Sequence, residues 1–201
     1  MDSDICVERF ELSYRSYKLR IPLKFGSVVV EESVSLIVKA LARNRSGCEA
    51  IGLGSIPLVC EWAFPNPRVE YEDKLEAMKL VAERYAKLVE DESRSGVYRH
   101  PIDWFTRFEN EIARIASSVS RNLNLRVQLP ILAALVAVSP IDAAIHDGFG
   151  KVNGICSYDG YSPKFMERDL SFYLGSRFKG RYISDYIKPN YSYRIPIFHL
   201  V

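Results

Sequence analysis

The sequence predicts an α+β protein in which three antiparallel strands precede a bundle of helices and a final buried strand. Three observations predict this order. Apolar and polar residues alternate from residue 5 to about residue 59, which is the period of half-buried strands. Between about residues 70 and 153 the apolar residues recur at three- and four-residue steps, as in helices. Residues 193–201 are almost continuously apolar, like strands that parallel sheets bury on both faces.

The first part of the chain is predicted to form a three-stranded antiparallel meander. Its strands are expected at residues 5–21, 28–42 and 50–59. Pro22 is expected to end the first strand, because proline cannot donate a ladder hydrogen bond. Residues 44–47 (Asn-Arg-Ser-Gly) supply a turn before the third strand.

Two glycines interrupt the apolar pattern of the third strand. Gly52 and Gly54 weaken it as a strand and indicate a bulge or a close approach of another backbone. The segment from Cys60 to Pro67 is predicted to be an ordered loop that carries Trp62 and Phe64.

Helical periodicity begins near residue 70. An amphipathic helix is expected from about Glu70 to Glu92, and a second should begin at Pro101, since proline is favoured in a first turn. One side of the second helix carries apolar residues, namely Trp104, Phe105, Phe108, Ile112, Ile115 and Val119.

A third helical region spans residues 128–153. Residues 131–138 are almost all aliphatic, which predicts burial on every side. Pro140 follows Ser139, and proline in a helix interior removes a backbone hydrogen bond. We therefore expect two abutting helices here, followed by an irregular, tyrosine-rich segment.

Composition excludes several classes of partner. The chain has 27 basic and 25 acidic residues, interspersed, so neither nucleic acid nor an anionic membrane is expected as a partner. The N-terminus is acidic and lacks a signal-peptide pattern, and no apolar run reaches the roughly 18 residues of a bilayer span. We expect a soluble, cytoplasmic protein.

The four cysteines are Cys6, Cys48, Cys60 and Cys156. They form no Cys-x-x-Cys pair, so neither a zinc site nor a disulfide framework is expected. The prediction is free thiols that are mostly buried.

The order of elements and one motif resemble the enolase superfamily, in particular its mandelate racemase and muconate lactonizing branch. The family helix has the approximate form Glu-x-Ala-x-x-Asp-x-x-Gly-Lys-x-x-Gly. Residues 142–154 match it, with Asp142 in place of Glu and with Ala144, Asp147, Gly150 and Lys151 in register. Further likeness lies in residues 52–54 (Gly-Leu-Gly), although Ser55 stands where the family often has an acid, and in residues 195–197 (Ile-Pro-Ile).

The resemblance implies a capping domain at residues 1–154, an unusually long linker at 155–192, and the first strand of a TIM barrel at 193–201. It implies a lyase or isomerase that abstracts the proton α to the carboxylate of a small acid, such as a sugar acid, with Mg²⁺ as cofactor. In the family's order the metal ligands and catalytic bases would lie beyond residue 201, so these residues alone are expected to be inert. A homo-oligomer or a separate barrel chain is a possible partner.

In such a cap, two loops shape substrate specificity. Here they correspond to residues 22–28, which include Lys24 and Phe25, and to residues 55–67, with Ser55, Trp62 and Phe64. A cation suits a substrate carboxylate, and aromatic rings exclude water. The alternatives are that Lys24 is a solvated turn residue and that Trp62 packs under its loop. His199, on the last strand, is a further candidate substrate contact.

Asp142 and His146 are four residues apart, which places them on one helix face. Two ligands do not make a metal site, so we expect Asp142 to stabilise the helix and His146 to be satisfied by packing or by a backbone carbonyl.

One alternative function remains open, namely a self-sufficient α+β module for ligand binding or protein interaction. Hydrolase or transferase chemistry finds no support, because the sequence has no Gly-x-Ser-x-Gly elbow and no phosphate loop.

Overall fold

The computed structural model describes residues 1–25, 28–188, 190–192 and 194–197, with the side chain of Phe25 outside the described part. The strands pair in the order β1-β2-β3, both pairs antiparallel. The predicted α+β class, a three-stranded meander followed by a helical bundle, is therefore confirmed. The main elements are β1 (Ile5–Phe25), β2 (Val28–Asn44), β3 (Glu49–Pro57), α1 (Cys60–Ala63), α2 (Tyr71–Arg94), α3 (Pro101–Asn122) and α4 (Ile131–Val152).

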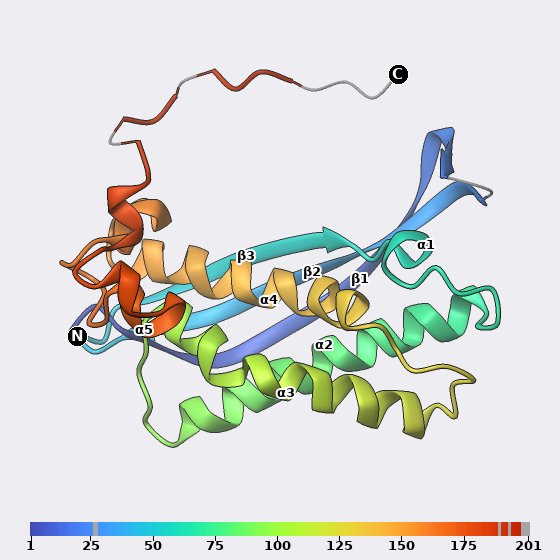
Figure 1. The fold of residues 1–201 in the computed structure, drawn as a ribbon, viewed down its shortest axis with the longest axis horizontal. Coiled ribbons are helices and arrows are strands. Elements are labelled where there is room, and N and C mark those ends of the chain that lie inside the picture. The colour runs from blue at the N-terminus through green and yellow to red at the C-terminus, as the bar shows by residue number, and fades with distance from the viewer. Residues whose placement is uncertain (26–27, 189, 193, 198–201) are drawn as a thin grey trace. The chain divides into compact units, whose positions relative to one another are not determined.

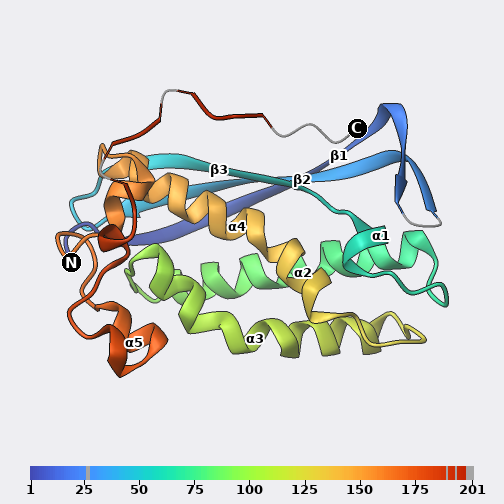
Figure 2. The ribbon, with the colours of Figure 1, turned by 45° about the horizontal axis from the view of Figure 1, so that its top comes forward.

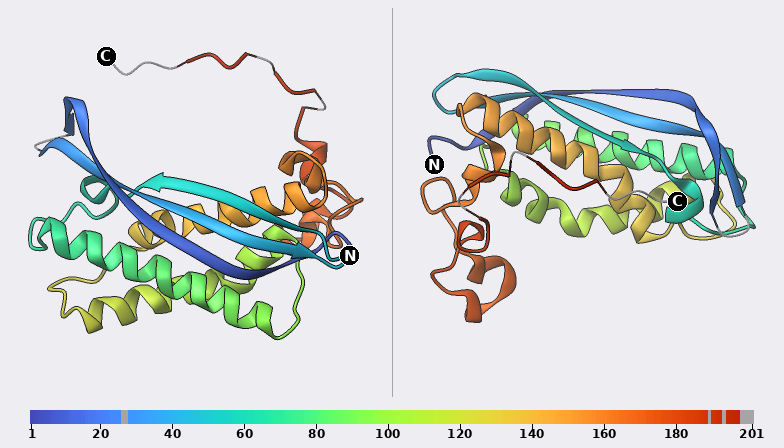
Figure 3. Two further views of the ribbon diagram at one scale, coloured as in Figure 1. Left: turned by 180° about the vertical axis from the view of Figure 1, so that it is seen from behind. Right: turned by 90° about the horizontal axis from the view of Figure 1, so that it is seen from above.

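The helices cover one face of the sheet (Figures 1 and 2). α4 lies beneath β2 and β3, α2 lies beneath β1, and α3 packs against α2 and α4 as a further layer. Figure 3 shows the same stacking from behind. Alternate residues of β2, including Leu36, Val38 and Ala40, are fully buried toward the helices. The core thus lies between one sheet face and the helices.

The first strand is longer than the sequence predicts. β1 continues through Pro22 to Phe25, so the expectation that Pro22 ends the strand is wrong. The ladder to β2 is irregular between Lys18 and Leu23, which pair with Glu32 and Val30. Pro22 lies inside this irregular stretch, where no ladder hydrogen bond requires a backbone N–H from residue 22. Such positions tolerate proline.

The two glycines of β3 mark a close approach, as the sequence predicts. A Cβ on Gly54 would fall on the carbonyl oxygen of Pro140, and one on Gly52 would fall on that of Ala144. Gly148 completes the contact from the helix side, where a Cβ would lie 2.8 Å from Cβ of Ala42. α4 and the sheet therefore meet backbone to backbone.

Pro140 does not divide the third helical region. α4 is one helix from Ile131 to Val152, so the expectation of two abutting helices is wrong. Proline leaves the carbonyl of Val136 without its helical donor, and the hydroxyl of Ser139 donates to that oxygen at 2.9 Å. This local replacement allows the helix to continue.

The N-terminal half of α4 is not buried on every side. Ile131 is 52% exposed, and Leu132 and Leu135 are also exposed, so this expectation is wrong as well. Their face of the helix points away from the sheet and from the other described helices. By length and composition α4 could span a membrane, but half of its apolar window is buried within the protein, as in a core helix.

α3 begins at Pro101, as predicted. The backbone N–H of Ile102 donates to Nδ1 of His100 at 3.3 Å, so His100 caps the helix. At the same end, Nε1 of Trp104 donates to the carbonyl of Ile5 at 3.0 Å, which ties α3 to the start of the sheet.

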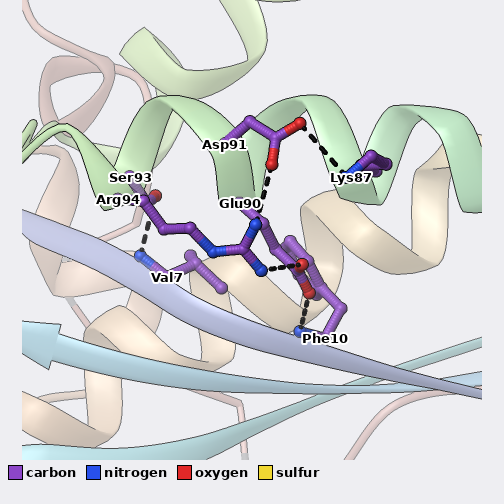
Figure 4. A network of polar contacts seen from close by, with 7 residues as sticks. All are labelled: Val7, Phe10, Lys87, Glu90, Asp91, Ser93 and Arg94. Atoms are coloured by element: carbon purple, nitrogen blue, oxygen red, sulfur yellow. Dashed lines mark hydrogen bonds and ion pairs between the residues drawn. The ribbon is translucent and has the colours of Figure 1, made fainter.

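Side chains of α2 occupy the edge of β1 (Figure 4). The N–H of Val7 donates to Oγ of Ser93 at 3.1 Å, and the N–H of Phe10 donates to Oε1 of Glu90 at 2.6 Å. Arg94 pairs in turn with Glu90. Part of an edge that could pair with another chain is thereby closed.

Two of the four cysteines depart from the prediction. All are free, but only Cys6 and Cys60 are buried, whereas Cys48 and Cys156 are exposed. Both exposed cysteines lie outside helices and strands, in segments that are not packed against an apolar core that would bury a thiol.

The chain divides into two compact units, Met1–Ser157 and Tyr158–Val201. The second unit contains one short α-helix, α5 (Leu170–Leu174), with 3₁₀ turns around it. The carboxylate of Asp169 accepts from the N–H groups of Ser171 and Gly180. Residues 194–197 are exposed and have no regular structure, while residues 193 and 198–201 lie outside the described part. The predicted strand at 193–201 stays a prediction.

The backbone contact gives a stability prediction. Gly54→Ala should lower the free energy of unfolding by about 3 kcal/mol, because the added methyl group has only backbone atoms to displace. Ser55→Ala, at the exposed neighbouring position, should change it by less than about 0.5 kcal/mol. Chemical denaturation measures both; equal effects would contradict the inferred contact.

Candidate functional site

The two loop regions selected from the sequence come together at one end of the first unit. The β1–β2 hairpin and α1 lie at the same end in Figures 1 and 3. A cleft of about 420 Å³ lies between them. It is lined by Lys18, Val29, Val30, Glu31, Glu32, Glu61 and Tyr71, which come from β1, β2, α1 and the start of α2.

The predicted residues of the hairpin and of β3 lie around this cleft rather than in it. Lys24 is exposed near the hairpin tip and stands opposite Val29 in the ladder. The backbone of Phe25 ends β1. Ser55 is exposed and alternates with the buried Gly54, so it points to the sheet face opposite α4. Of these residues, the structure places only Lys24 near a cleft-lining side chain.

The two aromatic candidates have opposite surroundings. Trp62 lies on α1 and is 47% exposed, so it does not pack under its loop. Phe64 is fully buried, with Nζ of Lys74 lying 5.9 Å from its ring centroid. Only Trp62 is therefore available to touch a molecule at this surface. α1 also replaces part of the predicted ordered loop at residues 60–67. His199 lies outside the described residues.

The cleft has an acidic character that the sequence analysis missed. Glu31, Glu32 and Glu61 outnumber Lys18 among its lining residues. Burial, together with Cys60 and the carboxylates of Glu61 and Glu32, raises the pKa of Tyr71 to about 12. Tyr71 therefore keeps its hydroxyl proton at neutral pH. Adjacent acids at residues 31–32 interrupt the strand alternation, which is the one signal that could have indicated this feature.

Such a cleft can hold a cationic or hydrogen-bonding group, whereas its carboxylates repel an anion. The cation predicted to meet a substrate carboxylate, Lys24, is absent from the residues that line the cleft. Any carboxylate at this end would meet Lys24 beyond the cleft and not inside it.

Asp142 and His146 form a pair on α4. Nε2 of His146 lies 3.7 Å from Oδ1 of Asp142. Burial raises the pKa of Asp142 above its ordinary value of 3.8, against the opposing effect of His146. Burial likewise lowers the pKa of His146 below 6.5, against the effect of Asp142. The fully buried Tyr85 has a raised pKa, caused by burial and by the charge of Asp142.

The described residues do not fit a metal ion. Among them, no three or more His, Cys, Asp and Glu side chains are arranged to hold one. The acidic residues of the cleft are thus no substitute for a ligand set, and neither are Asp142 and His146.

No protein-family model and no curated protein matches the sequence. Among solved structures, the chain is similar to an enolase from Bradyrhizobium complexed with magnesium and mandelic acid (13% identity, TM-score 0.46, 77% of this chain and 34% of that chain). It is also similar to the L-Ala-D/L-Glu epimerase from Bacillus subtilis in a substrate-liganded complex (16% identity, TM-score 0.39, 74% and 32%).

A third similar structure is the L-talarate/galactarate dehydratase from Salmonella typhimurium LT2 (18% identity, TM-score 0.41, 83% and 34%). These structural neighbours are enolase-superfamily enzymes. This chain spans about a third of the length of its neighbours, with 34%, 32% and 34% of their chains covered.

The half-buried pair of Asp142 and His146 gives a prediction for pH dependence. Because the folded protein binds the proton of Asp142 more tightly than the unfolded chain does, ionising this group costs stability as the pH rises above 3.8 and through the raised pKa. Asp142→Asn removes that cost. It should raise the free energy of unfolding at pH 7, and the gain should shrink as the pH falls toward about 4.

Denaturation curves between pH 4 and 7 measure the difference. Asp2→Asn, at the exposed N-terminus, is the matched control and should leave the wild-type pH dependence in place. A gain from Asp142→Asn that is independent of pH would show that the ionisation of Asp142 is not its source.

Proposed function

We propose that residues 1–157 form the substrate-capping domain of a metal-dependent lyase or isomerase of the enolase superfamily. The enzyme would abstract the proton α to the carboxylate of a small acid, such as a sugar acid, in the cytoplasm. The catalytic residues would lie on a barrel outside these 201 residues, either in the same polypeptide or in a partner chain. The cap itself would select the substrate and shield it from water.

The convergence of the hairpin and α1 carries this proposal. Residues 22–28 and 55–67 were selected from the sequence because each corresponds to a specificity loop of the family. The hairpin that carries the first segment and α1 within the second flank one cleft, to which the second segment contributes Glu61. The motif helix supports the same assignment. Asp147 and Lys151 of the motif both hydrogen-bond to the backbone of β3, so these matching residues have a shared structural use.

Exposed apolar residues support a covering partner. Trp62 on α1 and Ile131, Leu132 and Leu135 on α4 are exposed, and α1 contacts α4. Apolar side chains gathered in this way are typical of surfaces that meet another domain or chain. A barrel in contact with this surface would cover them.

Within the cap, we assign the substrate contacts to Lys24 and Trp62. The ammonium group of Lys24 would pair with a substrate carboxylate, and the indole of Trp62 would exclude water from the closed site. Phe64 supports α1 from below. A divalent metal would stabilise negative charge on the substrate carboxylate. The described residues offer no ligand set for such a metal.

A stand-alone binding module is the second candidate. One observation favours it, namely that the unit Met1–Ser157 has its own core and that helix side chains occupy part of the β1 edge. In that case the acidic cleft, and not a barrel, would be the binding surface.

The coding sequence beyond Val201 separates the two candidates. The capping proposal expects the downstream reading frame, or a neighbouring gene, to encode barrel strands that end in three carboxylate ligands, together with a Lys or His base. If neither contains such a barrel, the stand-alone module is the better account.

The assignment of Lys24 gives a kinetic prediction. In the polypeptide that includes the barrel, Lys24→Ala should lower kcat/KM for the carboxylate substrate about tenfold, the equivalent of about 1.4 kcal/mol for the lost ion pair. Stability should not change, because Lys24 is exposed.

Lys39→Ala is the matched control, since Lys39 is an exposed lysine on the same sheet that pairs with Glu11. It should keep the wild-type kcat/KM. Equal losses of kcat/KM in both variants would show that the effect comes from the overall charge of the sheet. Lys24 would then have no specific role in substrate binding.

A further inference from the structure

Two residues of the motif helix hold the outer edge of β3. The backbone N–H of Leu53 donates to Oδ2 of Asp147 at 2.8 Å, and Nζ of Lys151 donates to the carbonyl of Ile51 at 2.9 Å. Lys151 also pairs with Oδ2 of Asp147 at 2.6 Å. Together these four residues close the edge of β3 that faces away from β2.

The spacing of this contact follows from the two backbone geometries. Residues four apart on a helix are separated by about 6 Å along its axis. Residues two apart on a strand are separated by about 6.8 Å, and their N–H and C=O groups point to the same edge. The side chains of Asp147 and Lys151, four residues apart on the helix, therefore lie opposite the N–H of Leu53 and the C=O of Ile51, two residues apart on the strand.

The glycine contact makes this match specific. Gly52 and Gly54 lie against the backbone of α4, where no Cβ fits. If β3 moved along α4 by two residues, Ala50 or Ile56 would have to occupy one of these positions. The hydrogen bonds hold the edge, and the glycines exclude the neighbouring registers.

The segment that follows β3 is short, since only Leu58 and Val59 separate β3 from α1. Leu58 is buried, and its N–H donates to the carbonyl of Val34 on β2 at 2.8 Å, so the segment is packed against the sheet. Cys60, Ala63 and Phe64 are also buried, which leaves Trp62 as the exposed side chain of α1. A displacement of β3 along α4 would therefore be transmitted to Trp62.

We propose that Asp147 and Lys151 are positioning residues that fix β3 on α4 and thereby set the position of Trp62 in the substrate-selecting loop. The reference to substrate selection rests on the proposed function. The mechanical part, from Asp147 to Trp62, does not, so it can fail or hold independently of any enzyme activity.

The test is ¹⁹F NMR of the chain labelled with 5-fluorotryptophan. The chain has two tryptophans, Trp62 at the surface and Trp104 fully buried. In Asp147→Ala we expect the Trp62 signal to shift or broaden while the Trp104 signal stays in place. Hydrogen exchange at the amide of Leu53 should rise at least about tenfold in the same sample.

Asp91→Ala is the matched control. Asp91 forms an i,i+4 ion pair with Lys87 at 3.5 Å and a second pair with Arg94 at 2.8 Å, all on α2. Figure 4 draws no dashed line from Asp91 or Lys87 to a strand. Both fluorine signals should remain as in the wild type. A Trp62 signal that responds equally to both variants would assign the change to general helix charge and overturn the proposal.

Faster exchange at Leu53 with an unchanged Trp62 signal would also overturn it, because the edge would then open without moving the loop. If Asp147→Ala fails to fold, the same fluorine and hydrogen-exchange measurements are made on Lys151→Met. It keeps the aliphatic stem and removes the ammonium group that donates to Ile51 and pairs with Asp147, and the same two outcomes apply.

Discussion

The structure depends on one backbone contact, between the glycines of β3 and the middle of α4. Gly52 and Gly54 lack the atom that would collide with the carbonyls of Ala144 and Pro140, so the helix lies closer to the sheet than side chains would allow. Close packing of this kind gains dispersion energy from many atom pairs and tolerates no added volume. α2 and α3 are placed relative to this pair, because α2 packs on α4 and α3 packs on both.

The same contact links the fold to the candidate site. β3 runs along α4 and leads through Leu58 and Val59 into α1, and α1 forms one wall of the cleft while the hairpin forms another. The backbone contact and the polar contacts of Asp147 and Lys151 lie side by side on one strand. In the proposal above, Asp147 and Lys151 act on loop position through β3, although neither residue lines the cleft.

Periodicity and turn residues predicted the meander, the helices and the close approach at the glycines, because these follow from patterns within a single segment. Two predictions at prolines were wrong because the surrounding residues compensate for the missing N–H. Pro22 falls in an irregular stretch of the ladder, and the carbonyl that Pro140 leaves without its helical donor accepts a hydrogen bond from the hydroxyl of Ser139. Neither compensation can be read from propensity alone. The acidic cleft was missed because its residues come from four elements that only tertiary packing brings together.

Charge along the hairpin bears on where a substrate would bind. Three carboxylates and one ammonium line the cleft at the hairpin base, whereas Lys24 stands near the tip. Inside a cleft the effective dielectric is lower than in bulk water, so these carboxylates act more strongly on an anion than exposed ones would. A small carboxylate would be repelled from the cleft and attracted toward Lys24. Under the proposed function, this charge distribution favours a substrate carboxylate bound near Lys24 and outside the acidic cleft. The cleft would then serve only where the hairpin meets the rest of the domain.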